Sequence, residues 1–88
     1  MTPEEEIQRA GEANSILKNP VFKDAVSQVE EAILFGIRKA AISDTALREK
    51  LSVRYAVLHD LLDRLKSTME TGKMAEVTLA QRIKNLVR

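Results

Sequence analysis

The sequence lacks cysteine and has few residues that interrupt helices or favour sheets. It contains no cysteine, three glycines, two prolines, two phenylalanines, one tyrosine and no tryptophan. Without thiols the chain forms neither a disulfide nor a thiolate metal site. The residues that remain abundant, Ala, Leu, Glu, Lys and Arg, are typical of helices. We therefore expect an all-α protein.

A strong charge of one sign and a long hydrophobic run are also missing. The formal net charge is +1, so the molecule as a whole has no field that attracts nucleic acid. The longest apolar run is Ala32–Ile37, far shorter than the roughly 20 residues that span a bilayer. The acidic start at Glu4–Glu6 is unlike a secretory signal. We expect a soluble protein without membrane contacts, for which a reducing cytosol is a suitable location.

Capping residues divide the first half of the chain into two predicted helices. Thr2 and Glu5 have the spacing of a capping box, which marks the start of a first helix. Asn19 can cap a second helix, and the proline after it predicts that the first helix stops near Lys18. The second helix is predicted over 20–41, where apolar residues recur at intervals of three and four.

The second half of the chain holds the clearest helix. Ser43 or Asp44 can cap it after a short connection, which places it antiparallel to the second helix. Its apolar residues are spaced almost as heptads: Leu47, Leu51, Tyr55, Leu58, Leu62, Leu65 and Met69. We predict an antiparallel, coiled-coil-like helical hairpin with a shorter N-terminal helix beside it. Gly72 is predicted to end the third helix.

The residues after Ala75 are predicted to be a separate basic, amphipathic helical tail. We therefore divide the chain into a single helical domain over 1–75 and a tail over 76–88. Residues 73–88 carry a charge of +3, whereas residues 1–12 carry −3. The tail can be a solvated helix, a docking helix for another protein or a phosphate contact. The candidate contact residues are Lys73, Arg82, Lys84 and Arg88.

No arrangement of residues points to catalysis, a metal or a cofactor. His59 is the only histidine and has no further ligands at a suitable spacing, so it is interpreted as a histidine at the edge of the core. The adjacent Glu30 and Glu31 face different directions on a helix, and no phosphate-binding loop is present. We expect a protein that is not an enzyme.

The apolar belt Ile33–Ile37 carries the main functional inference. Ile33, Leu34, Phe35 and Ile37 point around the whole circumference of the second helix. Either the first helix or the tail covers the second side of this belt, or the chain associates with itself there. Because the first helix is only weakly apolar, the belt favours a homo-oligomer interface.

Arg54 lies on the apolar side of the third helix, one turn before Leu58. An ion pair with Glu30 of the same chain is one interpretation. The other is a contact across an oligomer interface, because a polar residue on an apolar seam can select a partner and a register.

Two stretches of the sequence resemble a group of phage proteins. These stretches are Asn19-Pro20-Val21-Phe22 and the segment from Leu58 to Leu65 that closes on Thr71-Gly72-Lys73-Met74-Ala75. Together with the helix around Glu30-Glu31, they resemble short helical proteins encoded among the head and packaging genes of tailed bacteriophages. The resemblance implies a virion, assembly or DNA-packaging context, with another component of the particle as a partner and the host cytoplasm or the virion as the location.

The function expected is therefore that of a non-enzymatic helical assembly protein that acts as a homo-oligomer. A nucleic-acid-binding packaging adaptor, similar to a small terminase subunit, is the first alternative, because oligomerisation would multiply the charge of the tail. A small phage inhibitor of a host protein is the second alternative.

Overall fold

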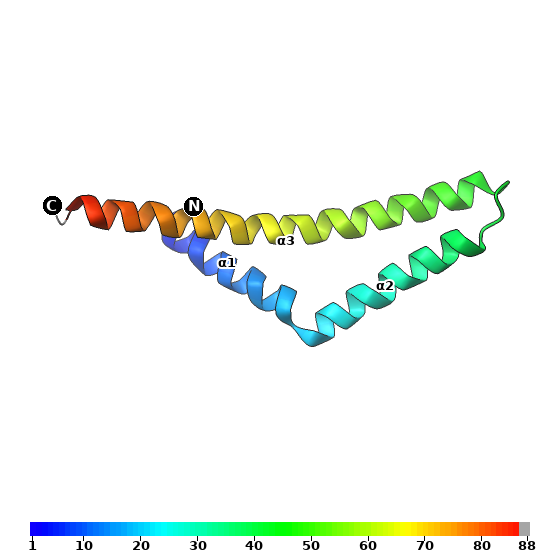
Figure 1. The fold of residues 1–88 in the computed structure, drawn as a ribbon, viewed down its shortest axis with the longest axis horizontal. Coiled ribbons are helices and arrows are strands. Elements are labelled where there is room, and N and C mark those ends of the chain that lie inside the picture. The colour runs from blue at the N-terminus through cyan, green and yellow to red at the C-terminus, as the bar shows by residue number, and fades with distance from the viewer. Residues whose placement is uncertain (87–88) are drawn as a thin grey trace. The chain divides into compact units, whose positions relative to one another are not determined.

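The computed structural model describes residues 1–86 and contains three helices and no strand in that range (Figure 1). Helix α1 covers Pro3–Lys18, α2 covers Pro20–Lys39 and α3 covers Thr45–Leu86. The all-α prediction is confirmed. None of the helices within residues 1–86 has a stretch apolar and long enough to traverse a lipid bilayer.

The chain forms two compact units, and α3 contributes to both. The hairpin unit is Asn19–Leu62, and the terminal unit combines Met1–Lys18 with the part of α3 that starts at Asp63. Each unit consists of two antiparallel helices. In the terminal unit, Pro3 of α1 shares a hollow with Thr78, and Lys18 shares another with Met69.

The predicted capping residues begin the three helices. The backbone N–H of Glu5 donates to Thr2 Oγ1 at 3.2 Å, and Thr2 Oγ1 donates to a carboxylate oxygen of Glu5 at 3.1 Å. The N–H of Phe22 donates to Asn19 Oδ1 at 3.0 Å, and the N–H of Leu47 donates to Asp44 Oδ1 at 3.2 Å. These bonds satisfy amide groups that have no partner within the helix.

An arginine from α3 closes the other end of α2. Arg48 Nη1 donates to the carbonyl oxygen of Ile37 at 3.0 Å and to that of Ala40 at 3.4 Å. The last carbonyl groups of a helix have no intrahelical donor, and a cation there also complements the helix dipole. The end of α2 is therefore tied to the first turns of α3.

The core of the hairpin unit is small and lies between the predicted apolar faces. Ile33 of α2 is 6% exposed and Leu51 of α3 is 7% exposed. Gly36 lets Leu51 approach α2 closely, because a Cβ built on Gly36 would lie 3.0 Å from Leu51 Cδ1. The predicted hairpin of the second and third helices is thus present.

The prediction that Gly72 ends the third helix is wrong. Helix α3 continues through Gly72 to Leu86, so the predicted tail is, as far as Leu86, the last part of the same helix. Gly72 serves a different purpose: a Cβ there would lie 3.0 Å from the carbonyl oxygen of Glu6 and would overlap the Cβ of Ala10. It is the point at which α1 crosses α3, and the buried Ala13 and Ala75 follow Ala10 and Gly72 by three residues, about one helical turn.

Gly72 also interrupts a regular repeat along α3. The leucines that recur with a period of seven residues on either side of it are Leu51, Leu58, Leu65, Leu79 and Leu86. Gly72 occupies the position in this series between Leu65 and Leu79. Position 72 is therefore the one place in this leucine series without a side chain.

Candidate protein interaction surface

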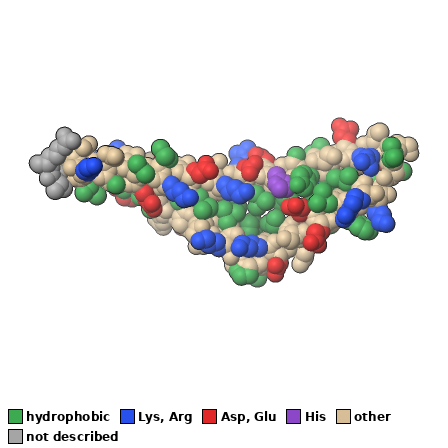
Figure 2. All heavy atoms as spheres, viewed as in Figure 1, with side chains coloured by type: hydrophobic (Ala, Val, Ile, Leu, Met, Phe, Trp, Pro, Cys, Tyr) green, Lys and Arg blue, Asp and Glu red, His purple; other side chains and the backbone are tan. Residues whose placement is uncertain are grey.

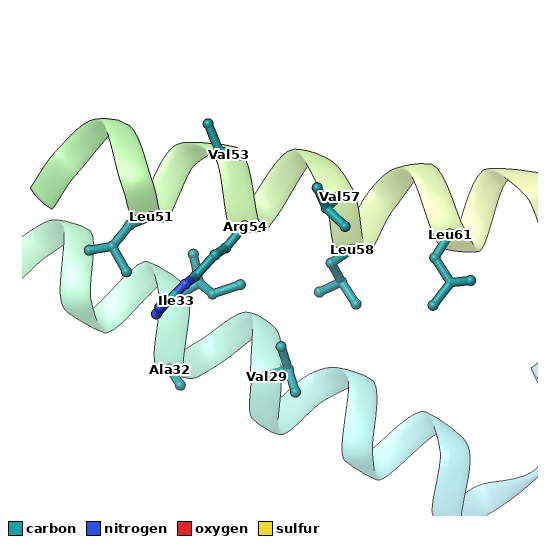
Figure 3. Close-up of a pocket in the computed structure, with 9 residues that line it drawn as sticks. All are labelled: Val29, Ala32, Ile33, Leu51, Val53, Arg54, Val57, Leu58 and Leu61. Carbon is teal, nitrogen blue, oxygen red and sulfur yellow. The ribbon is translucent and has the colours of Figure 1, made fainter. Parts of the chain in front are cut away.

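An open apolar groove runs along one flank of the hairpin unit (Figure 3). Its volume is about 580 Å³. The lining residues come from α2 and α3 and are Val29, Ala32, Ile33, Leu51, Val53, Arg54, Val57, Leu58 and Leu61. Val53, Val57 and Leu61 are four residues apart, so they form a second apolar row beside the heptad seam of α3.

The groove leaves large apolar side chains in contact with water. Val57 is 63% exposed, and Val53, Leu61 and Val29 are about half exposed. Complete burial of one such side chain stabilises a protein by about 1.5–3 kcal/mol. Covering the exposed half of each would therefore contribute roughly 1 kcal/mol per side chain. Sequence reasoning did not identify Val53 and Val57; their spacing of four residues was the available signal.

Arg54 lies in this groove without a carboxylate partner among residues 1–86. Its side chain reaches across toward Ile33 (Figure 3). The alternative ion pair between Arg54 and Glu30 does not form. Instead, Glu30 lies 3.6 Å from His59 Nε2 on the opposite flank, where Figure 2 shows the histidine beside acidic side chains. No acidic residue lines the groove, so Arg54 has only apolar neighbours there.

The belt Ile33–Ile37 is divided between the inside and the outside of the hairpin unit. Ile33 packs against α3, and Ile37 is half-buried. By contrast, Leu34 is 39% exposed and Phe35 is 56% exposed. The Phe35 ring lies under the flexible Lys39, whose Nζ is 5.6 Å from the ring centroid. The hairpin unit therefore does not shield its own belt from water.

The predicted basic contact residues do not form one patch. Lys73, Arg82 and Lys84 are exposed, and none has an ion-pair partner within residues 1–86. Lys73 and Lys84 are eleven residues apart, which is about three turns, so they lie on the same side of α3. Arg82 follows Lys73 by nine residues and points to the opposite side. Arg88 lies outside the described residues.

His59 contributes to packing between α2 and α3. Its ring lies against that of Tyr55, with 4.3 Å between the ring centroids. Nε2 is shielded from solvent and has no hydrogen-bond partner. No group of three or more metal-ligating side chains gathers within residues 1–86. The arrangement around His59 is that of a side chain at the edge of a core.

Comparison of the chain with protein-family models, with curated proteins and with solved structures found no match. The groove, the exposed side chains of the belt and the lack of a carboxylate partner for Arg54 within residues 1–86 are therefore the observations that bear on function.

Proposed function

We propose that the chain is a non-enzymatic helical assembly protein that associates with copies of itself through the hairpin unit. The observation that carries this proposal is the open apolar surface formed by the groove and by Leu34 and Phe35. Two helices bury only one interface, and stable helical domains normally add a further layer. A second copy supplies such a layer without any other component.

The grouping of the exposed apolar residues supports association. Single exposed apolar residues are ordinary on protein surfaces. Here, however, Val29, Val53, Val57 and Leu61 line one hollow together. Contiguous apolar patches of this kind mark sites of protein interaction on small proteins. The few buried residues of the hairpin unit leave much of its apolar surface available for a partner.

Light scattering coupled to size-exclusion chromatography tests the proposal directly. We expect a mass above that of one chain, and a mass that falls on dilution, because linked association depends on concentration. The double variant Leu34→Ser with Phe35→Ser should shift the protein toward the monomer and retain its helical circular dichroism. A wild-type protein that stays monomeric at high micromolar concentration would contradict the proposal.

A matched control separates loss of the interface from a general effect of polar substitution. Ile42, in the turn between α2 and α3, is 89% exposed and does not line the groove. Ile42→Ser should leave the mass of the oligomer unchanged. Equal dissociation by Ile42→Ser would show that the belt has no special part in association.

The biological setting proposed is the head or packaging machinery of a tailed phage, with a second particle component as a further partner. This part rests on the sequence resemblance at Asn19–Phe22 and Thr71–Ala75. Identification of the proteins that co-purify with the tagged chain from infected cells tests it. Recovery of a capsid, portal or packaging component is expected, whereas exclusive recovery of a host protein favours the inhibitor alternative.

A packaging adaptor that binds nucleic acid is the second candidate function. The observation that favours it is the exposure of Lys73, Arg82 and Lys84 without ion-pair partners in the described range. An oligomer would repeat these cations once per copy and so strengthen the attraction to phosphates. Within a single chain their distribution on two sides of α3 makes this attraction weak.

A further inference from the structure

Two surfaces of different character lie on different sides of the hairpin unit. One is the groove, which contains Arg54. The other, here called the outer patch, consists of Glu31, Leu34 and Phe35 of α2. Leu34 and Phe35 follow Glu31 by three and four residues, so the three side chains are neighbours on the helix. Glu31 is about 200° around α2 from the buried Ile33, so the outer patch faces away from α3.

We propose that the outer patch of one copy docks into the groove of the next copy, and that the Glu31 carboxylate pairs with the Arg54 guanidinium of that neighbour. Leu34 and Phe35 then cover Val29, Val53, Val57 and Leu61. This inference rests on the proposed function, because it names the partner surface of the same groove. It makes the contact between copies head-to-tail, with two different surfaces at each interface.

Charge complementarity supports this pairing of surfaces. The groove offers a cation and no carboxylate, and Arg54 has no acidic partner within residues 1–86. The outer patch offers a carboxylate, and Glu31 likewise has no ion-pair partner there. On docking, Lys39 must leave the face of the Phe35 ring, where an exposed cation–π contact is a weak interaction. Burial of the large, half-exposed Phe35 ring against the valines of the groove outweighs that loss.

A symmetric contact between two grooves fits the observations less well. It would place two arginines in one apolar interface without a carboxylate from either groove. It would also leave Phe35, which does not line the groove, in water. A head-to-tail contact covers both surfaces with a single kind of interface. Each added copy presents a new free groove or a new free patch, so assembly ends only when a ring closes.

Mixing two variants distinguishes the head-to-tail contact from a symmetric one. Val57→Lys blocks the groove and keeps the outer patch, whereas Phe35→Lys blocks the outer patch and keeps the groove. Each variant alone should be monomeric. An equimolar mixture should form a heterodimer of two chains and no larger species, because only one intact groove and one intact patch meet.

The outcomes separate the inference from the proposed function. If the wild-type protein associates but the mixture stays monomeric, the head-to-tail contact is wrong and self-association stands. The same holds if Phe35→Lys still associates alone. If the wild-type protein is monomeric, the proposed function itself fails. Circular dichroism of both variants, whose substituted side chains are exposed, shows whether each remains helical.

Charge reversal tests the ion pair on its own. Arg54→Glu and Glu31→Arg should each weaken self-association about tenfold in Kd, which is the effect expected for a close charge pair across an interface. The protein that carries both substitutions should recover to within about threefold of the wild type. A double variant as weak as either single variant would overturn the assignment of Glu31 as the partner of Arg54.

Discussion

Gly72 of α3 lies directly against Ala10 of α1, so close that a Cβ on the glycine would overlap that of the alanine. This contact fixes the crossing point of the two helices in the terminal unit. It also explains why a residue of low helix propensity occurs in the interior of a 42-residue helix.

Replacement of Gly72 by alanine is expected to lower the free energy of unfolding by about 1–3 kcal/mol, the usual cost of overpacking. The helix propensity of alanine opposes this effect but is smaller. Gly11 is the matched control, because nothing lies within 4 Å of a Cβ built there. Gly11→Ala should stabilise the protein by about 0.5–1 kcal/mol. Urea unfolding followed by circular dichroism measures both, and equal stabilisation by the two substitutions would contradict the close contact.

Loss of the Arg48 side chain should loosen the end of α2. Arg48→Ala removes the two hydrogen bonds to Ile37 and Ala40, and about 1–2 kcal/mol of stability is expected to be lost. Arg48→Lys keeps the charge near the helix end and should lose less. Amide hydrogen exchange in the last turn of α2 should become faster in the alanine variant. Unchanged exchange there would show that the bonds contribute nothing.

His59→Phe is expected to leave stability unchanged or to raise it by up to about 1 kcal/mol. Phenylalanine keeps the ring against Tyr55 and removes a shielded nitrogen that lacks a hydrogen-bond partner. His59→Ala, which removes the ring itself, should be clearly less stable. If the phenylalanine and alanine variants are equally destabilised in urea, the contact of His59 with Glu30 matters more than the ring packing.

The nucleic-acid candidate makes a prediction about the two sides of α3. A complex held by the side that carries Lys73 and Lys84 should lose about two units of its logarithmic salt slope in the Lys73→Ala, Lys84→Ala variant. Arg82→Ala, on the opposite side, should leave the slope unchanged. Gel-shift titrations over a salt series provide the measurement. Binding that ignores salt or survives the lysine substitutions would exclude these lysines as the phosphate contact.

Features set by neighbouring residues could be predicted from the sequence. Thr2, Asn19 and Asp44 cap helices at the expected places because a capping side chain bonds an amide only three residues away. The apolar faces of α2 and α3 were also predictable, because Ile33 and Leu51 follow helical periodicity. Neither inference needed knowledge of the tertiary structure.

Features set by contacts between distant residues were not predictable. A glycine at position 72 is compatible both with the end of a helix and with close packing against another helix. Only the position of Ala10 distinguishes these two roles. Likewise, the sequence allows an ion pair between Arg54 and Glu30. In the structure Glu30 lies beside His59, whereas Arg54 lies in the groove. Leu61 broadens the apolar face of α3 in the sequence, but Val53 and Val57 are hard to recognise as groove residues beside the stronger heptad repeat.

The absence of a side chain at Gly72 restricts where α1 can lie along α3. Movement of α1 by one turn along α3 would bring Ala10 against Met69 or Ala75, each of which carries the Cβ that Gly72 lacks and has no room for at such a close approach. Sliding of the two helices past one another is thereby blocked in both directions. The absence of a side chain at position 72 thus determines where the N-terminal helix packs along α3.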